Sequence, residues 1–449
     1  MFKKSMFLAL AALMLAAAFP VFAGGGTDLK GETIVIGKWW GPDYDVNTFK
    51  PNNTAEEEIL AWRTKIQQEN GFTMREKEVA TWNDMQSRAA TSIMTGTPAA
   101  SVFYLEPGWA MALMAQGLLY PVNENKAVNL RNPQPAAKGA AVVKWNQSAI
   151  DSMTFGGKAY AFAQDINIDN TQVIFFNKRL FREAGLNPDL PYDMQKAGTW
   201  TWDAFLDVCK KLTRDTNNDG RMDTYAMAMD LSTEILDAII SSNGAQYVTK
   251  DGSGKFVNAT GRPEFLEGLQ FAIKLKNEGV MKPRPDKSNW DWFKAEFTDG
   301  RVAMRVDESY VKSELGRMRD DWGMVLFPKG PRKATYTVYS RDNLMVIPAS
   351  FKSDQVDKIM QAVALWFTPV NDDWKSGLYN QFRDARAVDE TVNLIRTINH
   401  TTKYHRYIKS LERGDIAWEM WFHEGDPAQL VESVSQSWNA LINDANRIK

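Results

Sequence analysis

The sequence predicts an α/β protein built from two lobes. Its 449 residues exceed what one hydrophobic core ordinarily serves, which favours two domains. In the first third of the chain, short apolar runs alternate with stretches of helical pattern, an order typical of a largely parallel, doubly wound sheet. Further along, residues 173–176 form an uninterrupted apolar run, as expected of a strand that is buried on both faces.

The elements of the N-terminal region follow from local patterns. Residues 54–70 predict a helix, with Thr54 as its N-cap, glutamates in its first turn and Asn70-Gly71 at its end. The other elements expected in this region are strands at 32–37, 72–79 and 101–105 and helices at 81–94 and 110–115. Loops that follow such strands lie where open α/β sheets bind their ligands.

The second half of the chain predicts further helices and one hairpin. Thr201 is expected to cap a helix that continues to Leu212, and Asp251-Gly252 is expected at the turn of a hairpin over 246–256. The other elements expected are helices at 178–185, 231–243, 263–279, 353–367 and 427–445, and a return crossing between the lobes at 335–347. Residues 370–425 show no pattern that assigns an element.

Composition and charge place the chain among ordinary folded proteins. Hydrophobic residues make up 44% and charged residues 24% of the chain. The formal net charge of −2 gives no sign of a nucleic-acid or anionic-membrane partner. Sixteen tryptophans are an excess for this length. They serve either the core or, as flat apolar ring faces, the stacking of sugars.

The N-terminus has the pattern of an export signal. Two lysines precede a short apolar core at 6–18, and Val21-Phe22-Ala23 suits cleavage, so residues 1–23 are expected to be removed. No cysteine lies near this point, which predicts an exported, soluble protein without a lipid anchor. The single cysteine, Cys209, excludes an intramolecular disulfide and, with the export signal, favours a bacterial periplasm.

A longer pattern occupies residues 157–186. It consists of Gly157-Lys158-x-Tyr160, a polar window at 164–170, an apolar strand, Phe176-Asn177-Lys178 and Leu180-Phe181-x-x-Ala184-Gly185-Leu186. This order resembles the hinge region of extracellular solute-binding proteins, the receptors of ABC importers, and in particular the sugar-binding family 1 that includes maltose-binding protein. Many relatives have proline in place of Ala163 and tyrosine in place of Phe176.

Further motifs of the same family follow in the expected order. They are Gly117-Leu118-Leu119-x-Pro121-Val122, Thr199-Trp200-Thr201-Trp202, Phe297-x-x-Gly300-Arg301-x-Ala303-Met304 and Pro328-x-Gly330-Pro331. The resemblance covers most of residues 32–368 and the last helix. It implies a periplasmic-binding-protein fold, with two doubly wound lobes joined by hinge crossings and a ligand cleft between them. It places lobe one at 24–163 with about 343–388, and lobe two at 164–342 with about 389–449.

The resemblance and the predicted strand ends together nominate a ligand site. The aromatic side chains expected to stack on sugar rings are Trp39, Trp40, Trp82, Trp109, Trp290 and Tyr310. The polar side chains expected to face the ligand are Glu106, Gln164, Asp165, Asn167, Asp307 and Arg341. One of Trp39 and Trp40 is expected to pack inward. For Arg341, an anionic or highly hydroxylated ligand and a salt bridge to a cleft acid are equally good interpretations.

Residues 215–223 match the front half of a calcium loop. The expected ligands are the side chains of Asp215, Asn217, Asp219 and Asp223 and the carbonyl of Arg221. The twelfth position of the loop is Ala226 instead of glutamate, which removes the bidentate ligand and weakens the site. A structural calcium ion and a solvated, Asx-rich turn are both kept as interpretations. No other cofactor is expected.

The sequence contains no catalytic motif. Gly-x-Ser-x-Gly, His-Glu-x-x-His and a P-loop glycine run are all missing from it. We therefore expect a monomeric binding protein, not an enzyme, that closes on a sugar and docks on an ABC permease in the membrane. Two alternatives remain. One is a secreted carbohydrate-active enzyme with a carboxylate pair in its cleft, and the other is the same fold with a peptide, polyamine or phosphate ester as its ligand.

Overall fold

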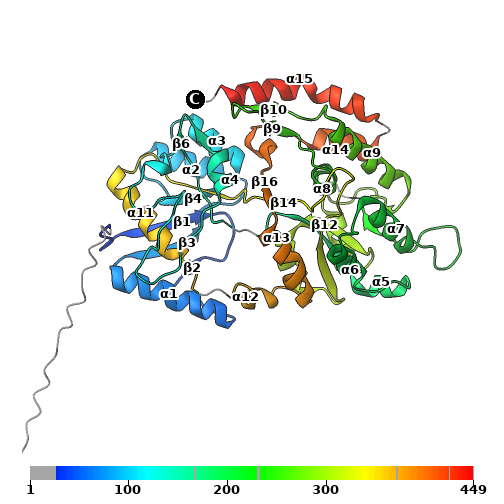
Figure 1. Ribbon diagram of the computed structural model, residues 1–449, viewed down its shortest axis with the longest axis horizontal. Helices are drawn as coiled ribbons and strands as arrows, with labels where there is room; N and C mark the ends of the chain where they lie inside the picture. Colours follow the sequence, from blue (N-terminus) through cyan, green and yellow to red (C-terminus); the bar gives the residue numbers. More distant parts are fainter. Residues whose placement is uncertain (1–26, 166–167, 230–232, 371–372, 424, 448–449) are drawn as a thin grey trace, which may run out of the picture.

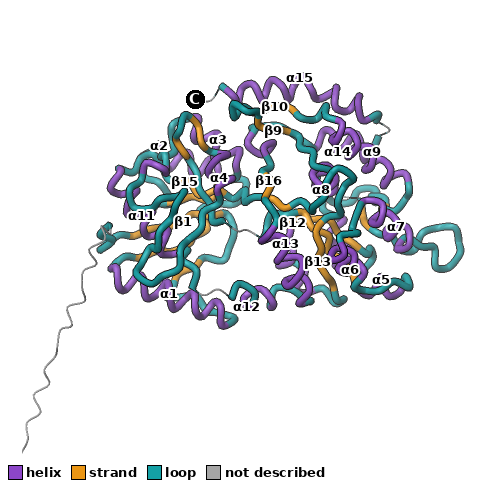
Figure 2. Tube along the Cα trace, viewed as in Figure 1, coloured by secondary structure: helices purple, strands orange, loops and turns teal. Residues whose placement is uncertain are grey.

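The chain forms two bodies that lie side by side (Figure 1). The computed structural model describes residues 27–447 apart from 166–167, 230–232, 371–372 and 424, so the predicted export signal at 1–23 lies outside the described residues. The N-terminal third and α11 (Ser353–Trp366) build lobe one, and most of the remaining chain builds lobe two (Figure 1). Helices surround the strands in both lobes (Figure 2). The predicted two-lobed α/β architecture is therefore confirmed.

Lobe one is built on a five-stranded sheet. In spatial order its strands are β15 (Leu344–Val346), β4 (Val102–Leu105), β1 (Thr33–Lys38), β3 (Thr73–Glu78) and β2 (Tyr44–Asp45). The inner strands β4, β1 and β3 run parallel, whereas the edge strands β15 and β2 run antiparallel to their neighbours. The carboxyl ends of the three parallel strands therefore meet at one edge of the sheet.

Helices cover both faces of this sheet. They are α1 (Thr54–Asn70), α2 (Met85–Met94), α3 (Pro107–Ala115), α4 (Gln147–Ser152) and α11. The prediction of Thr54 as the N-cap of α1 is wrong by one residue, because the extended residue is Asn53, whose side-chain oxygen accepts the Glu56 N–H at 3.0 Å. The Trp62 indole donates to the Leu365 carbonyl at 2.8 Å and ties α1 to α11.

The main sheet of lobe two has a central strand that runs antiparallel to both of its neighbours. That strand is β7 (Gln172–Asn177), and it pairs antiparallel with β12 (Met304–Glu308) and β13 (Trp322–Leu326). Every residue of β7 is buried, as predicted for residues 173–176. A parallel bridge between Tyr225 and Val302 adds β8 (Met227–Ala228) and β11 (Met281–Lys282), which are parallel to each other.

Lobe two contains the four helices predicted for residues 178–279 and two that were not predicted. The predicted helices are α5 (Lys178–Glu183), α7 (Trp202–Leu212), α8 (Glu234–Ser242) and α9 (Pro263–Asn277), and the other two are α6 (Leu190–Ala197) and α10 (Trp292–Thr298). Thr201 caps α7 as predicted, since its hydroxyl oxygen accepts the Ala204 N–H at 3.4 Å. The predicted hairpin is formed by β9 (Val248–Lys250) and β10 (Phe256–Asn258).

The C-terminal region contacts both lobes. Its elements are α12 (Ser376–Tyr379), the π-helix η4 (Ala387–Val392), α13 (Asn393–Thr397), β16 (His400–Thr401), the 3-10 helix η5 (Tyr404–Tyr407), α14 (Gly414–Phe422) and α15 (Pro427–Asn446). In this region α12 lies against α1, η4 lies against β13, and α15 packs along β10. Asp426 caps α15 with its carboxylate, and this helix runs along the upper edge of Figure 1. The exact lobe boundaries stay predictions.

Two short backbone pairings lie beside the segments that are predicted to cross between the lobes. Phe162 forms a β-bridge with Met345, and β14 (Val338–Tyr339) pairs in parallel with β16. Part of the tryptophan excess belongs to the core, because Trp200, Trp322, Trp366 and Trp438 are fully buried. Among the helices of the described residues, none has the length and apolarity that a membrane crossing requires.

Candidate functional site

Four tryptophans gather at the carboxyl ends of the parallel strands of lobe one. We call Trp39, Trp40, Trp82 and Trp109 the tryptophan cluster. The first two directly follow β1, Trp82 follows β3, and Trp109 lies in the first turn of α3, just after β4. Ring centroids are 4.8 Å apart for Trp39 and Trp40, 5.4 Å for Trp39 and Trp109, and 5.3 Å for Trp82 and Trp109. The sheet therefore brings together rings that come from three separate loops.

The cluster leaves part of its aromatic surface open to solvent. Trp40 is 36% exposed and Trp82 is 52% exposed. Trp39 is half-buried and packs against the core, so it is the member of the first pair that points inward. Exposed indole rings at one edge of a sheet leave apolar area in water, which is typical of a ligand-binding surface. Each ring offers a flat apolar face together with one N–H donor.

Hydrogen-bonding groups continue from one end of the cluster. The Tyr104 ring lies 5.1 Å from the Trp40 ring, and its hydroxyl lies beside the guanidinium of Arg341. Burial raises the pKa of Tyr104 to about 12, and the charge of Arg341 opposes this shift. Nη1 of Arg341 donates to Oε1 of Gln164 at 3.3 Å. The pairing of Tyr104 with Met345 accounts for this arrangement, since it carries the segment before β15 over the end of β4.

A second group of side chains forms a partly buried ion network between the lobes, in which Glu308, Asp342 and Lys403 are buried and Glu106 and Arg406 are half-buried. We call Glu106, Glu308, Asp342, Lys403 and Arg406 the Arg406 network. The Arg406 guanidinium lies 2.6 Å from Glu106, 2.7 Å from Asp342 and 3.7 Å from Glu308. The Lys403 ammonium binds Glu308 at 2.5 Å. Glu106 is engaged by Arg406 in this conformation, and its predicted contact with the ligand stays a prediction.

Burial determines the electrostatics of this network. It raises the pKa of Glu308 to about 8, while Lys403 and Arg406 pull it down. The pKa of Arg406 is raised by Asp342, Glu106 and Glu308, which outweigh the opposing effect of burial. Removing one partner of such a group leaves the others buried and unmatched. The network therefore holds the junction in this conformation.

Asp307 is hydrogen-bonded to other residues of its own strand, β12. It is buried, and its carboxylate accepts two hydrogen bonds from Arg305, at 2.9 and 2.5 Å, and one from the Glu308 N–H at 2.8 Å. Burial raises the pKa of Asp307, and Arg305 opposes the shift. Both oxygens of this carboxylate are engaged within the protein in this conformation, and the ligand-binding role of Asp307 stays a prediction.

No contact with the tryptophan cluster is observed for the remaining predicted residues that the structure describes. Trp290 is 61% exposed, and the Lys294 ammonium lies 5.1 Å from the centroid of its ring. Tyr310 is 44% exposed and lies in the 3-10 helix η2 (Ser309–Ser313). Asp165 follows Gln164 and interacts electrostatically with Arg396. Asn167 lies outside the described residues. The ligand-binding roles of all these residues stay predictions.

The predicted calcium loop folds around its own carboxylates. Asp215 accepts the backbone N–H groups of Asn218 and Gly220, each at 2.7 Å. Asp223 accepts the Thr216 hydroxyl at 2.6 Å, and this hydrogen bond lowers its pKa. Within the described ranges, no group of three or more His, Cys, Asp or Glu side chains is placed to hold a metal ion. The five ligands named above therefore stay a prediction.

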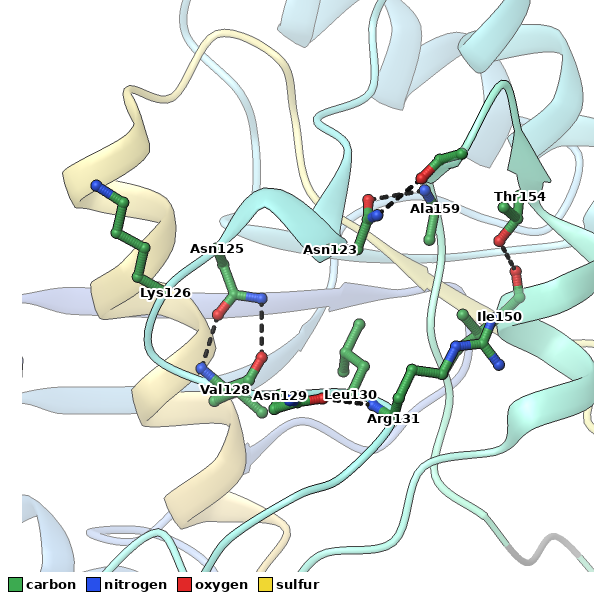
Figure 3. A pocket seen from close by; sticks show the side chains of 11 residues that line it. Asn123, Asn125, Lys126, Val128, Asn129, Leu130, Arg131, Ile150, Thr154 and Ala159 are labelled. Carbon is green, nitrogen blue, oxygen red and sulfur yellow. Dashed lines mark hydrogen bonds between the residues drawn. The ribbon is translucent and has the colours of Figure 1, made fainter.

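A cavity of about 440 Å³ lies elsewhere, on the outer part of lobe one (Figure 3). The loop around residues 123–131 forms one wall, and Ile150, Thr154 and Ala159 form another. Its asparagines are engaged locally: Asn123 accepts the Ala159 N–H at 2.8 Å, for example. Of the predicted ligand-binding residues that the structure describes, none lines this cavity. The cavity and the tryptophan cluster are therefore separate features.

The sequence analysis missed several members of these groups. Tyr104 is part of a predicted strand, and no pattern in the neighbouring sequence indicates that its hydroxyl lies beside Arg341. Lys403 and Arg406 belong to the region that showed no pattern, and their partners lie 64 to 300 residues away in the chain. Only contacts that the folded chain makes between its lobes identify these residues.

Comparisons with known proteins agree with this architecture. A family model of bacterial extracellular solute-binding proteins matches residues 77–379. The cyclic α-maltosyl-1,6-maltose binding protein of Arthrobacter globiformis has a similar structure, with a TM-score of 0.64 and 14% identity over 92% of this chain and 99% of that one. The maltotriose binding protein of Thermus thermophilus gives a TM-score of 0.55 and 16% identity, over 92% and 99% of the two chains.

A third similar structure has a ligand of another kind. UgpB of Mycobacterium tuberculosis, solved with glycerophosphocholine, gives a TM-score of 0.61 and 13% identity over 92% of this chain and 98% of that one. A comparison with curated protein sequences finds no match. At these identities the structural likenesses establish the fold, and the family model establishes the family. The chain belongs to the bacterial extracellular solute-binding proteins.

Proposed function

We propose that this protein is the substrate-binding component of an ABC importer and that it captures a carbohydrate for a membrane permease. The observation that carries the proposal is the tryptophan cluster, with the hydrogen-bonding groups of Tyr104, Gln164 and Arg341 at one end. Sugars present apolar C–H faces and polar hydroxyls, and this arrangement offers partners for both. The sugar ligands named for two of the similar structures support the same class.

Capture in this proposal is a closure of two lobes around the ligand. In this proposal the chain crosses between the lobes after Ala163 and before β15, next to the bridge between Phe162 and Met345 and the pairing of β14 with β16. A few such connecting residues absorb the backbone change of a hinge motion. A ligand that contacts both lobes shifts the population toward the closed form by its differential affinity for that form.

Binding without chemistry is part of the proposal. The family and the similar structures are binding proteins. The proposed receptor is exported to the periplasm after removal of residues 1–23, acts as a monomer and releases its ligand unchanged. A hydrolase would instead consume the ligand.

Thermal unfolding with a panel of mono- and oligosaccharides tests this proposal. A sugar present at 100 times its dissociation constant is expected to stabilise the chain by about 2.7 kcal/mol. Chromatography of the same samples is expected to recover the sugar unchanged. A stabilisation that decays while the sugar is consumed would instead support the enzyme alternative, and a panel without any stabilising sugar would contradict a carbohydrate ligand.

A second candidate keeps the receptor and changes the solute. Indole faces also bind quaternary ammonium groups, and one similar structure holds glycerophosphocholine. The same panel therefore includes glycerophosphocholine. Stabilisation by this compound, with no response to any sugar, would favour the second candidate.

A further inference from the structure

We propose that the ligand carries an anionic group, which Arg341 binds at the end of the tryptophan cluster while an adjacent ring stacks on Trp40. This inference rests on the proposed function, because it concerns the same site and specifies the ligand class as an acidic saccharide. It starts from one unusual feature of Arg341: a half-buried guanidinium whose hydrogen-bond partner Gln164 is neutral.

Arg341 differs from the other guanidinium groups at the centre of the molecule. Arg305 is bound by Asp307, and Arg406 is bound by Glu106 and Asp342. Within the described residues, Arg341 forms no ion pair, and its hydrogen bond to Gln164 is long, at 3.3 Å. Its Nε is buried and has no hydrogen-bond partner in that part of the chain. A buried donor without a partner is costly, so an acceptor from outside the protein fits this position.

The acids that adjoin Arg341 and its partner Gln164 in the chain are engaged with other cations. Asp342, the next residue, binds Arg406 at 2.7 Å, so the extended crossing directs neighbouring side chains to different partners. Asp165, which follows Gln164, interacts with Arg396. Of the two interpretations that the sequence leaves open for Arg341, these contacts therefore favour an anionic ligand over a salt bridge to a cleft acid.

The surroundings of Arg341 indicate which kind of anion fits. A guanidinium presents parallel N–H donors that match two oxygens of a carboxylate, sulfate or phosphate. Tyr104 lies between Arg341 and the Trp40 ring, and its centroid is 5.1 Å from that ring. A sugar ring on Trp40 would place an acidic substituent within reach of Arg341. The shared chemistry is an anionic oxygen group beside a stacked ring.

Calorimetric titration of the full mature chain tests the inference. The probes are digalacturonate, its neutral carboxyl-reduced counterpart, a sulfated disaccharide and glycerophosphocholine. The wild-type chain is expected to bind an acidic saccharide at least tenfold more tightly than the neutral one. Arg341→Met is expected to weaken the acidic ligand by roughly ten- to a hundredfold, the range for a charged hydrogen bond, and to weaken the neutral ligand much less, because a hydroxyl loses only an uncharged acceptor's hydrogen bond.

Two further variants keep the result interpretable. Arg341→Lys retains the charge and is expected to recover only part of the affinity, because an ammonium lacks the paired donors. Arg182→Met removes an exposed guanidinium from α5 and is expected to change neither affinity. Equal losses for the acidic and neutral ligands in both Arg341 variants would overturn the inference, since a purely structural role affects both ligands alike.

The outcomes separate the inference from the proposed function. Binding of the neutral saccharide alone would overturn the anionic ligand and leave a carbohydrate receptor. Binding of glycerophosphocholine alone would support the anionic group and overturn the carbohydrate. If no probe binds, while the chain remains folded by circular dichroism, both are contradicted.

Discussion

The tryptophan cluster and the Arg406 network lie in neighbouring parts of the molecule, yet they are built on opposite principles. The cluster is apolar and partly open, with Trp82 at 52% exposure. The network is charged and its members are buried or half-buried, and its carboxylates are matched by two cations at 2.5 to 3.7 Å. The cluster therefore leaves ring surface free to contact a ligand, whereas the charges of the network are paired with one another inside the chain. Binding and the cohesion of the junction should respond separately to mutation.

The largest expected effect falls on the network. Arg406→Met leaves Glu106 and Asp342 without their cation, and breaking a buried ion pair costs about 3–5 kcal/mol of unfolding free energy. Denaturant unfolding measures this loss. The control is Arg447→Met, which breaks an exposed pair with Asp444 and is expected to cost less than about 1 kcal/mol. Equal stability of both variants would show that the network does not hold the junction.

The cluster is expected to show the reverse behaviour. Trp40→Ala should weaken sugar binding by about 1–3 kcal/mol, the range for burying an aromatic side chain, with a smaller effect on stability. Trp418→Ala is the matched control, because that tryptophan is 48% exposed on α14 and its ring contacts Phe422. Titration calorimetry of both variants decides the matter, and unchanged affinity in Trp40→Ala would remove that ring from the site.

A smaller effect is expected at the predicted calcium loop, which belongs to neither group. Calcium at a few times its dissociation constant should add about 1 kcal/mol of stability. The loop lacks the glutamate of position twelve, so we expect this dissociation constant to be high. Melting temperatures in calcium and in chelator measure this difference. Asp215→Ala is expected to abolish it. If the wild-type chain melts at the same temperature in calcium and in chelator, the solvated turn is favoured.

A pH dependence is also expected, and it originates in the network. Since burial raises the pKa of Glu308 from its ordinary value of 4.5 to about 8, its contribution to stability is present below pH 4.5 and is lost as the pH rises through 8. Glu308→Gln stays neutral over this range and should flatten the dependence. Melting curves between pH 5 and pH 8 compare the two chains. A variant that loses as much stability as the wild-type chain between these values would assign the dependence to other groups.

The two groups also differ in how far the sequence predicts them. All four tryptophans of the cluster follow predicted strands or begin a helix after one, and parallel strands end at one edge of their sheet. Local pattern and sheet geometry were therefore enough to nominate Trp39, Trp40, Trp82 and Trp109. The network joins Glu106 to Arg406, across 300 residues, and no local pattern marks such a pair.

The fold class, the order of the main elements and the family resemblance were determined by the sequence alone. Periodicity and capping residues act over a few positions, so they can be recognised in a single chain. Tertiary structure decided which predicted carboxylates are already engaged, as Asp307 is by Arg305, and which cation forms no ion pair among the described residues, as is true of Arg341. The physical reason is that burial and charge pairing depend on distances in space, which spacing along the chain does not encode.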